Sequence, residues 1–165
     1  GNRIEGGDFL VDGDSSVLTG NHTQGTKGSL VVSADDCTIH GNYIHGAATV
    51  STTKKNPVIS GNYFVSSLTA KLVTDYVIIG NVVLGDIVVD DSSVTPTPGP
   101  GIIIGNHALR ITGTPGGAGA VIPAEGYVVL GNKVGNTNTI FAVDPNDDSV
   151  GSTVPNQILD FNVTK

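Results

Sequence analysis

The chain has 165 residues, a net charge of −7 and a single cysteine, and only 14% of its residues are charged and 5% aromatic. At this length one domain, residues 1–165, is expected. The negative charge argues against nucleic acid and membrane partners, no apolar run reaches the roughly 18 residues of a membrane span, and one cysteine excludes an internal disulfide. The core must come from small aliphatic residues, and no cofactor is expected.

A short phrase recurs along the whole chain: an aliphatic stretch followed by Gly-Asn, as in Pro57 to Phe64 (Pro-Val-Ile-Ser-Gly-Asn-Tyr-Phe). The repeated asparagines lie 19, 21, 20, 19, 25, 26 and 30 residues apart. A unit of this size cannot bury its own apolar face, so a near-constant period predicts units that stack as a solenoid. The asparagines are Asn2, Asn21, Asn42, Asn62, Asn81, Asn106, Asn132 and Asn162.

The first units, up to residue 81, are compact and regular. Their apolar pieces are short, β-branched and broken by Gly-Asn, which favours strands, since Gly and Asn tolerate left-handed backbone. No window shows a sustained 3.6-residue apolar period, so little or no helix is expected. The strands before each polar turn are expected at residues 9–11, 30–32, 48–50 and 68–73, and the turns at 12–16, 33–36, 54–57 and 74–75.

The later units, residues 82–165, contain longer loops rich in Pro, Gly, Ser and Asp. Insertions at one corner of a solenoid stack into one lateral face, where binding is often found. They are equally consistent with tolerated surface insertions. The loops are expected at Asp90 to Gly101, Thr112 to Gly126, and Asp144 to Gln157.

The predicted fold is all-β: a single-stranded parallel β-helix of about eight coils of about 20 residues, with strands about 4.8 Å apart. The aliphatic residue two before each glycine, such as Ile39 or Ile59, should point inward, as should the residue two after each asparagine. Repeated amides at one corner can form an asparagine ladder between coils. Its members would be Asn21, Asn42, Asn62, Asn81, Asn106 and Asn132.

The phrase V-I-x-G-N-x-I at about 20-residue spacing resembles the right-handed parallel β-helix of the pectate-lyase-like superfamily, which includes bacteriophage tailspikes. The resemblance covers nearly the whole chain and is specific for fold rather than function. It implies an extracellular structural and receptor-binding module of a phage particle, recognising a bacterial surface glycan. It also implies a homotrimer of parallel rods whose ends are covered by other domains or phage proteins.

Two other functions stay open at this point: a polysaccharide lyase or glycoside hydrolase, and a bacterial surface adhesin or filament subunit. The lyases of the superfamily use Ca²⁺-binding acids together with a basic residue. The only arginines here, Arg3 and Arg110, lie away from the acidic corner, so that assignment does not carry over.

The polar turns carry acids in most units, which form a predicted row of carboxylates at one corner. Two carboxylates about 5 to 9.5 Å apart could act as a glycosidase pair, and several oxygens could bind Ca²⁺. Asp and Asn are also ordinary turn residues that keep an edge soluble. The primary prediction is therefore that these acids form neither a catalytic site nor a metal site. The enzyme alternative would use Asp90, Asp91, Asp144, Asp147 and Asp148, the last three also being the metal candidates.

The residue after each repeated asparagine should point outward and stack on its equivalents in neighbouring units. Aromatic rings in such a row could pack on sugars or on a partner subunit, or simply stabilise the sheet. The predicted binding residues are His22, Tyr43, Tyr63 and His107. Cys37 precedes an inward strand and is interpreted as a small core residue.

Overall fold

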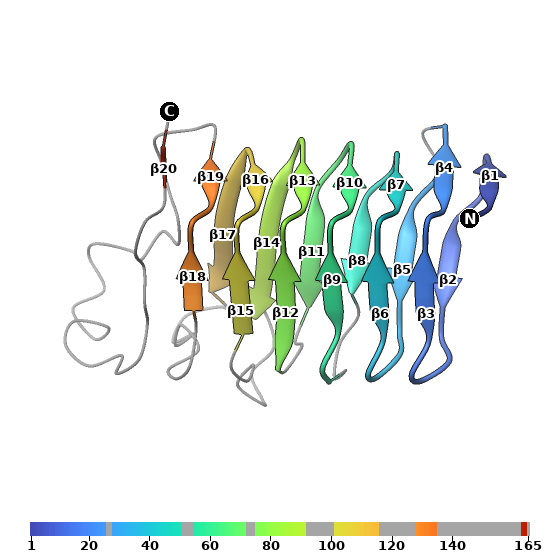
Figure 1. Ribbon diagram of the computed structural model, residues 1–165, viewed down its shortest axis with the longest axis horizontal. Coiled ribbons are helices and arrows are strands. Elements are labelled where there is room, and N and C mark those ends of the chain that lie inside the picture. The colour runs from blue at the N-terminus through green and yellow to red at the C-terminus, as the bar shows by residue number, and fades with distance from the viewer. Residues whose placement is uncertain are drawn as a thin grey trace.

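The computed structural model describes residues 1–25, 28–50, 55–71, 75–91, 101–115, 128–134 and 163–164. These ranges contain strands and turns and no helix. Successive turns of the chain lie side by side along the long axis of the molecule (Figure 1). The prediction of an all-β parallel solenoid is therefore confirmed.

The described strands form three sheets, in which every pairing is parallel. Sheet A contains β1 (Arg3–Glu5), β4 (His22–Gln24), β7 (Tyr43–Ile44), β10 (Tyr63–Phe64), β13 (Val82–Val83), β16 (His107–Ala108), β19 (Lys133–Val134) and β20 (Val163–Thr164). Sheet B contains β2 (Phe9–Val11), β5 (Leu30–Val32), β8 (Ala48–Val50), β11 (Leu68–Lys71), β14 (Asp86–Asp91) and β17 (Arg110–Pro115). Sheet C contains β3 (Val17–Thr19), β6 (Thr38–His40), β9 (Val58–Ser60), β12 (Tyr76–Ile79), β15 (Gly101–Ile104) and β18 (Val128–Leu130).

The repeat sets the register of the sheets, because equivalent residues of successive units pair directly. In sheet C, Ile39 pairs with Leu18 on one side and Ile59 on the other. Both isoleucines are at most 1% exposed, as expected for the position two before each glycine. Removing such a buried side chain to alanine typically costs about 2–5 kcal/mol. The core is a stack of mainly aliphatic layers enclosed by the three sheets, and it also contains the rings of Phe64 and Tyr76.

The Gly-Asn corner connects sheet C to sheet A. Its glycines have positive φ, for example 63° at Gly41 and 60° at Gly61. Left-handed backbone is unfavourable for residues with a β-carbon. One residue in this conformation bends the chain from sheet C into sheet A, and the asparagine that follows is buried.

The two long turns differ from the loop prediction, because strands run into the expected loops. Asp90 and Asp91 belong to β14 rather than to a loop, and β17 continues to Pro115. Six residues of β14 pair with six of β17, from Asp86 opposite Arg110 onward. Each extended strand thus has the other as its hydrogen-bonding partner. The remainder of those loops, and the whole of 144–157, lies outside the described residues.

Candidate functional site

The asparagines at the corner form a buried column of hydrogen bonds. The backbone N–H and the side-chain amide of Asn42 both donate to Oδ1 of Asn62, at 2.9 and 3.0 Å. The amide of Asn62 also donates to the carbonyl of Ile39 at 2.9 Å. The same double donation links the other neighbouring pairs from Asn21 to Asn132, and the asparagines of this range are at most 4% exposed. These amides pair buried backbone groups that would otherwise lack partners, so they are structural.

The carboxylates at the opposite corner also hold turn backbone. Oδ1 of Asp14 accepts the N–H of Asp35 at 2.9 Å, and Oδ1 of Asp35 accepts the N–H of Lys55 at 2.9 Å. Asp36, with φ of 52°, accepts a hydrogen bond from the side-chain amide of Asn56 at 2.7 Å. Within the described ranges, no three His, Cys, Asp or Glu side chains could hold a metal ion. The arrangement supports the structural interpretation of these acids.

Of the residues named for an enzyme, two lie in the described part of the chain, and they are consecutive in β14. Asp90 lies in β14, opposite Lys71 on one side and Thr114 on the other. Asp91 is opposite Pro115. The other three candidates, Asp144, Asp147 and Asp148, lie outside the described residues.

Three of the four predicted binding residues form a column of rings on the outer face of sheet A. The ring centroids of His22 and Tyr43 are 4.6 Å apart, with a 41° angle between the planes. Those of Tyr43 and Tyr63 are 5.0 Å apart, with planes within 3° of parallel. His107 lies in the same row but is separated from Tyr63 by Val82.

A second outward row on sheet A escaped the sequence interpretation. It starts with Glu5 and Gln24 and continues through residues just after the short strands, among them His45, Leu84 and Leu109. Leu84 is 52% exposed and Leu109 43%. The sequence contained the signal for this row, because residues two apart in a strand point to the same side. In each Asn-x-x-x segment the second residue points outward, so the fourth residue should point outward as well. We call the two rows together the sheet A face.

A serine and a histidine are hydrogen-bonded on the outer face of sheet C. Nδ1 of His40 lies 3.0 Å from Oγ of Ser60. An activated nucleophile needs a base that is itself oriented by a third group. Within the described ranges, no carboxylate bonds to this histidine, and the histidine is exposed. We therefore assign it no chemistry.

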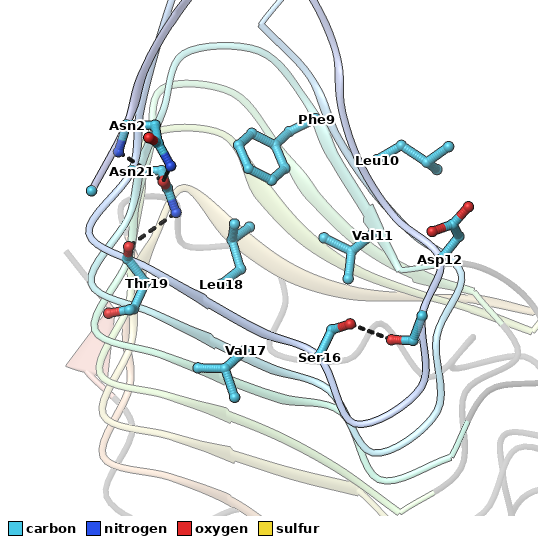
Figure 2. A pocket seen from close by; sticks show the side chains of 12 residues that line it. Asn2, Phe9, Leu10, Val11, Asp12, Ser16, Val17, Leu18, Thr19 and Asn21 are labelled. Atoms are coloured by element: carbon cyan, nitrogen blue, oxygen red, sulfur yellow. Dashed lines mark hydrogen bonds between the residues drawn. The ribbon is translucent and has the colours of Figure 1, made fainter.

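A cavity of 480 Å³ lies at the N-terminal end of the solenoid. Figure 2 shows Phe9, Val11 and Leu18 pointing into it, while Leu10 and Val17 point away. Among the described residues, Asp12 is the one acidic residue in its lining. The cavity is the apolar interior of the first turn seen end-on, and it has no arrangement of groups for catalysis.

Cys37 is fully buried in the core, in agreement with its interpretation as a small apolar residue. Burial raises the pKa of its thiol, a backbone hydrogen bond lowers it, and the nearby carboxylates of Asp35 and Asp36 raise it. A buried thiol that resists ionisation is a poor nucleophile. The structure thus gives this cysteine a packing role.

Comparison of the chain with protein-family models, curated proteins and solved structures found no match. The function is therefore argued from the solenoid and its surface. In the described part of the chain, no helix is long and apolar enough to cross a membrane.

Proposed function

We propose that this chain is a structural rod of a bacteriophage particle that binds a bacterial surface glycan through the sheet A face. The observation that carries the binding role is the column of rings formed by His22, Tyr43 and Tyr63. Aromatic side chains combine an apolar ring with a polar tip, which suits sugars, whose surfaces are mixed in the same way. The virion setting and the extracellular location rest on the resemblance to tailspikes.

In this proposal the repeat builds a right-handed rod of about eight coils with an asparagine ladder along its length. The buried amide column of the described residues supports a rigid scaffold. Rigid scaffolds favour binding because fewer side-chain and backbone motions are lost on association. Tyr43 and Tyr63 stand on adjacent paired strands, so their separation is set by the sheet rather than by a loop.

We further propose that rods self-associate, as a homotrimer, through the outer face of sheet C. Its outward residues include Val58, Val77 and Ile102, and the described strands of this sheet contain no Asp, Glu, Lys or Arg. A neutral face lets copies of an acidic chain approach without direct charge repulsion. Sedimentation should show a trimer that Val77→Glu dissociates and Thr49→Glu, on sheet B, leaves intact. A wild-type monomer at micromolar concentration would contradict this assembly.

The carboxylate contacts of Asp14 and Asp35 do not support the lyase or hydrolase alternative, because both accept backbone hydrogen bonds. The adhesin alternative would use the same sheet A face and differs only in the particle that carries the rod. Binding and cleavage therefore have to be measured separately.

The binding role can be tested with an array of bacterial capsular and O-antigen polysaccharides. The double variant Tyr43→Ala, Tyr63→Ala should weaken binding about tenfold, since two aromatic contacts are lost. The matched control is Thr49→Ala, Thr69→Ala, which alters two paired outward residues of sheet B. Equal loss in both variants, or none in either, would refute a site on sheet A. Shortening of a bound polysaccharide would instead support the enzyme alternative.

A further inference from the structure

Charge is unevenly distributed over the described surface of this acidic chain. Outside sheet A, the basic residues of the described ranges are Lys55, His40, and Lys71 and Arg110 in strands of sheet B. Glu5 is the acidic residue of the sheet A face, and it forms an ion pair with Arg3 at 2.9 Å. All other described carboxylates lie outside sheet A. The basic residues of the sheet A face are Arg3, His22, His45, His107 and Lys133.

All of these basic residues except His45 stand towards the two ends of one row, with the tyrosines between them. Register pairs lead from His22 through Tyr43 and Tyr63 to Val82, and then to His107 and Lys133. The row runs across the strands, along the axis of stacking. At about 4.8 Å per strand, five steps from His22 to Lys133 span about 24 Å. A ligand that uses the whole row must be long and extended.

We propose that the sheet A face binds an acidic polysaccharide, extended along the axis of the rod. Its sugar rings contact Tyr43 and Tyr63, and its carboxylates face the basic side chains at the two ends, above all His22 and Lys133. This inference rests on the proposed function and adds the charge and the direction of the glycan. A nucleic acid is the less favoured polyanion, because the net charge of −7 repels its dense phosphate backbone.

The test measures binding of the purified chain to acidic polymers (hyaluronan, alginate, polysialic acid), neutral polymers (dextran, pullulan, levan) and poly(dT). Any acidic polymer that binds is measured again after its carboxyl groups are reduced to alcohols. Lys133→Gln removes a charge from the row. Lys55→Gln removes an equal, exposed charge from the opposite corner and serves as the matched control.

We expect an acidic polymer to bind, its carboxyl-reduced form to bind at least about tenfold more weakly, and added salt to weaken binding. Lys133→Gln should weaken it about two- to fivefold, the range of one exposed ion pair, and Lys55→Gln should not. Binding only to neutral polymers, sensitive to Tyr43→Ala, would overturn this inference and leave the proposed function intact. Equal binding to poly(dT) would overturn the choice of a glycan, and binding to none of the polymers would contradict both proposals.

Discussion

The ring of Tyr76 occupies the space beside Gly101, its partner in the neighbouring strand of sheet C. A β-carbon added at Gly101 would lie 2.2 Å from Cζ of the tyrosine. Tyr76 is 1% exposed and is one of the largest fully buried side chains. The solenoid interior therefore accommodates a wide ring in one turn by omitting a side chain from the next.

Substitution of Gly101 by alanine should destabilise the fold by about 1–3 kcal/mol, the usual cost of overpacking a core. Urea unfolding followed by circular dichroism would measure the loss. Gly7→Ala is the control, because an added β-carbon there has no atom within 4 Å and φ is not left-handed. If both variants were equally stable, the close approach of Tyr76 and Gly101 would be wrong.

Removal of one amide from the buried column should be more damaging at its centre than at its end. Oδ1 of Asn62 accepts two hydrogen bonds from Asn42, and its amide donates to Asn81. Asn62→Ala leaves several buried groups without partners and should cost about 2–4 kcal/mol. Asn2→Ala, at the exposed end, should cost about 1 kcal/mol or less. Equal unfolding free energies for the two variants would show that the column contributes little.

The carboxylate of Asp35 should be replaceable by any acceptor of the same shape. Asp35→Asn keeps an oxygen for the N–H of Lys55, so stability should change little, whereas Asp35→Ala should lose about 1 kcal/mol. Asp12→Ala, at an exposed position of the same corner, is the control. A polysaccharide-cleaving activity abolished by Asp35→Asn at unchanged stability would contradict the structural role.

The thiol of Cys37 should make stability fall at alkaline pH. Its pKa in the folded chain is raised above the ordinary value of 9.0, mainly by burial. The contribution of the protonated thiol to the free energy of unfolding is complete below pH 9.0. It is lost as the pH rises towards the folded-state pKa, because the thiol of the unfolded chain ionises first. Between pH 7 and 10, the unfolding free energy of the wild type should fall more steeply with pH than that of Cys37→Ala. Rapid modification of the native thiol by a disulfide reagent at pH 8 would contradict the burial.

The solenoid was readable from sequence because one local signal repeats. Ile39 and Ile59 recur at one phase of the unit, and Gly41 and Gly61 mark the same left-handed corner. Each repetition is an independent observation of the same geometry, so the inward and outward positions could be separated. The extension of β14 to Asp91 was not readable, because an Asp-rich segment looks like a turn until a paired strand is seen beside it.

The parts of the candidate site could be predicted from the sequence to different degrees. The row of His22, Tyr43 and Tyr63 followed from the position after the repeated asparagine. The second row, with Leu84 and Leu109, was missed, although the alternation of side chains in a strand was enough to place it. The acids at the corner could have been catalytic by sequence. Their hydrogen bonds to backbone N–H groups of the next turn became visible only in three dimensions.

The sequence by itself determined that this chain stacks short strands, since a period near 20 residues with Gly-Asn corners leaves an apolar face that only a neighbouring unit can cover. Only the tertiary structure decided which groups meet across turns: Tyr76 beside Gly101, and Asp14 on the backbone of Asp35. Such contacts join residues about 20 positions apart, and they exist only once the register between turns has been set.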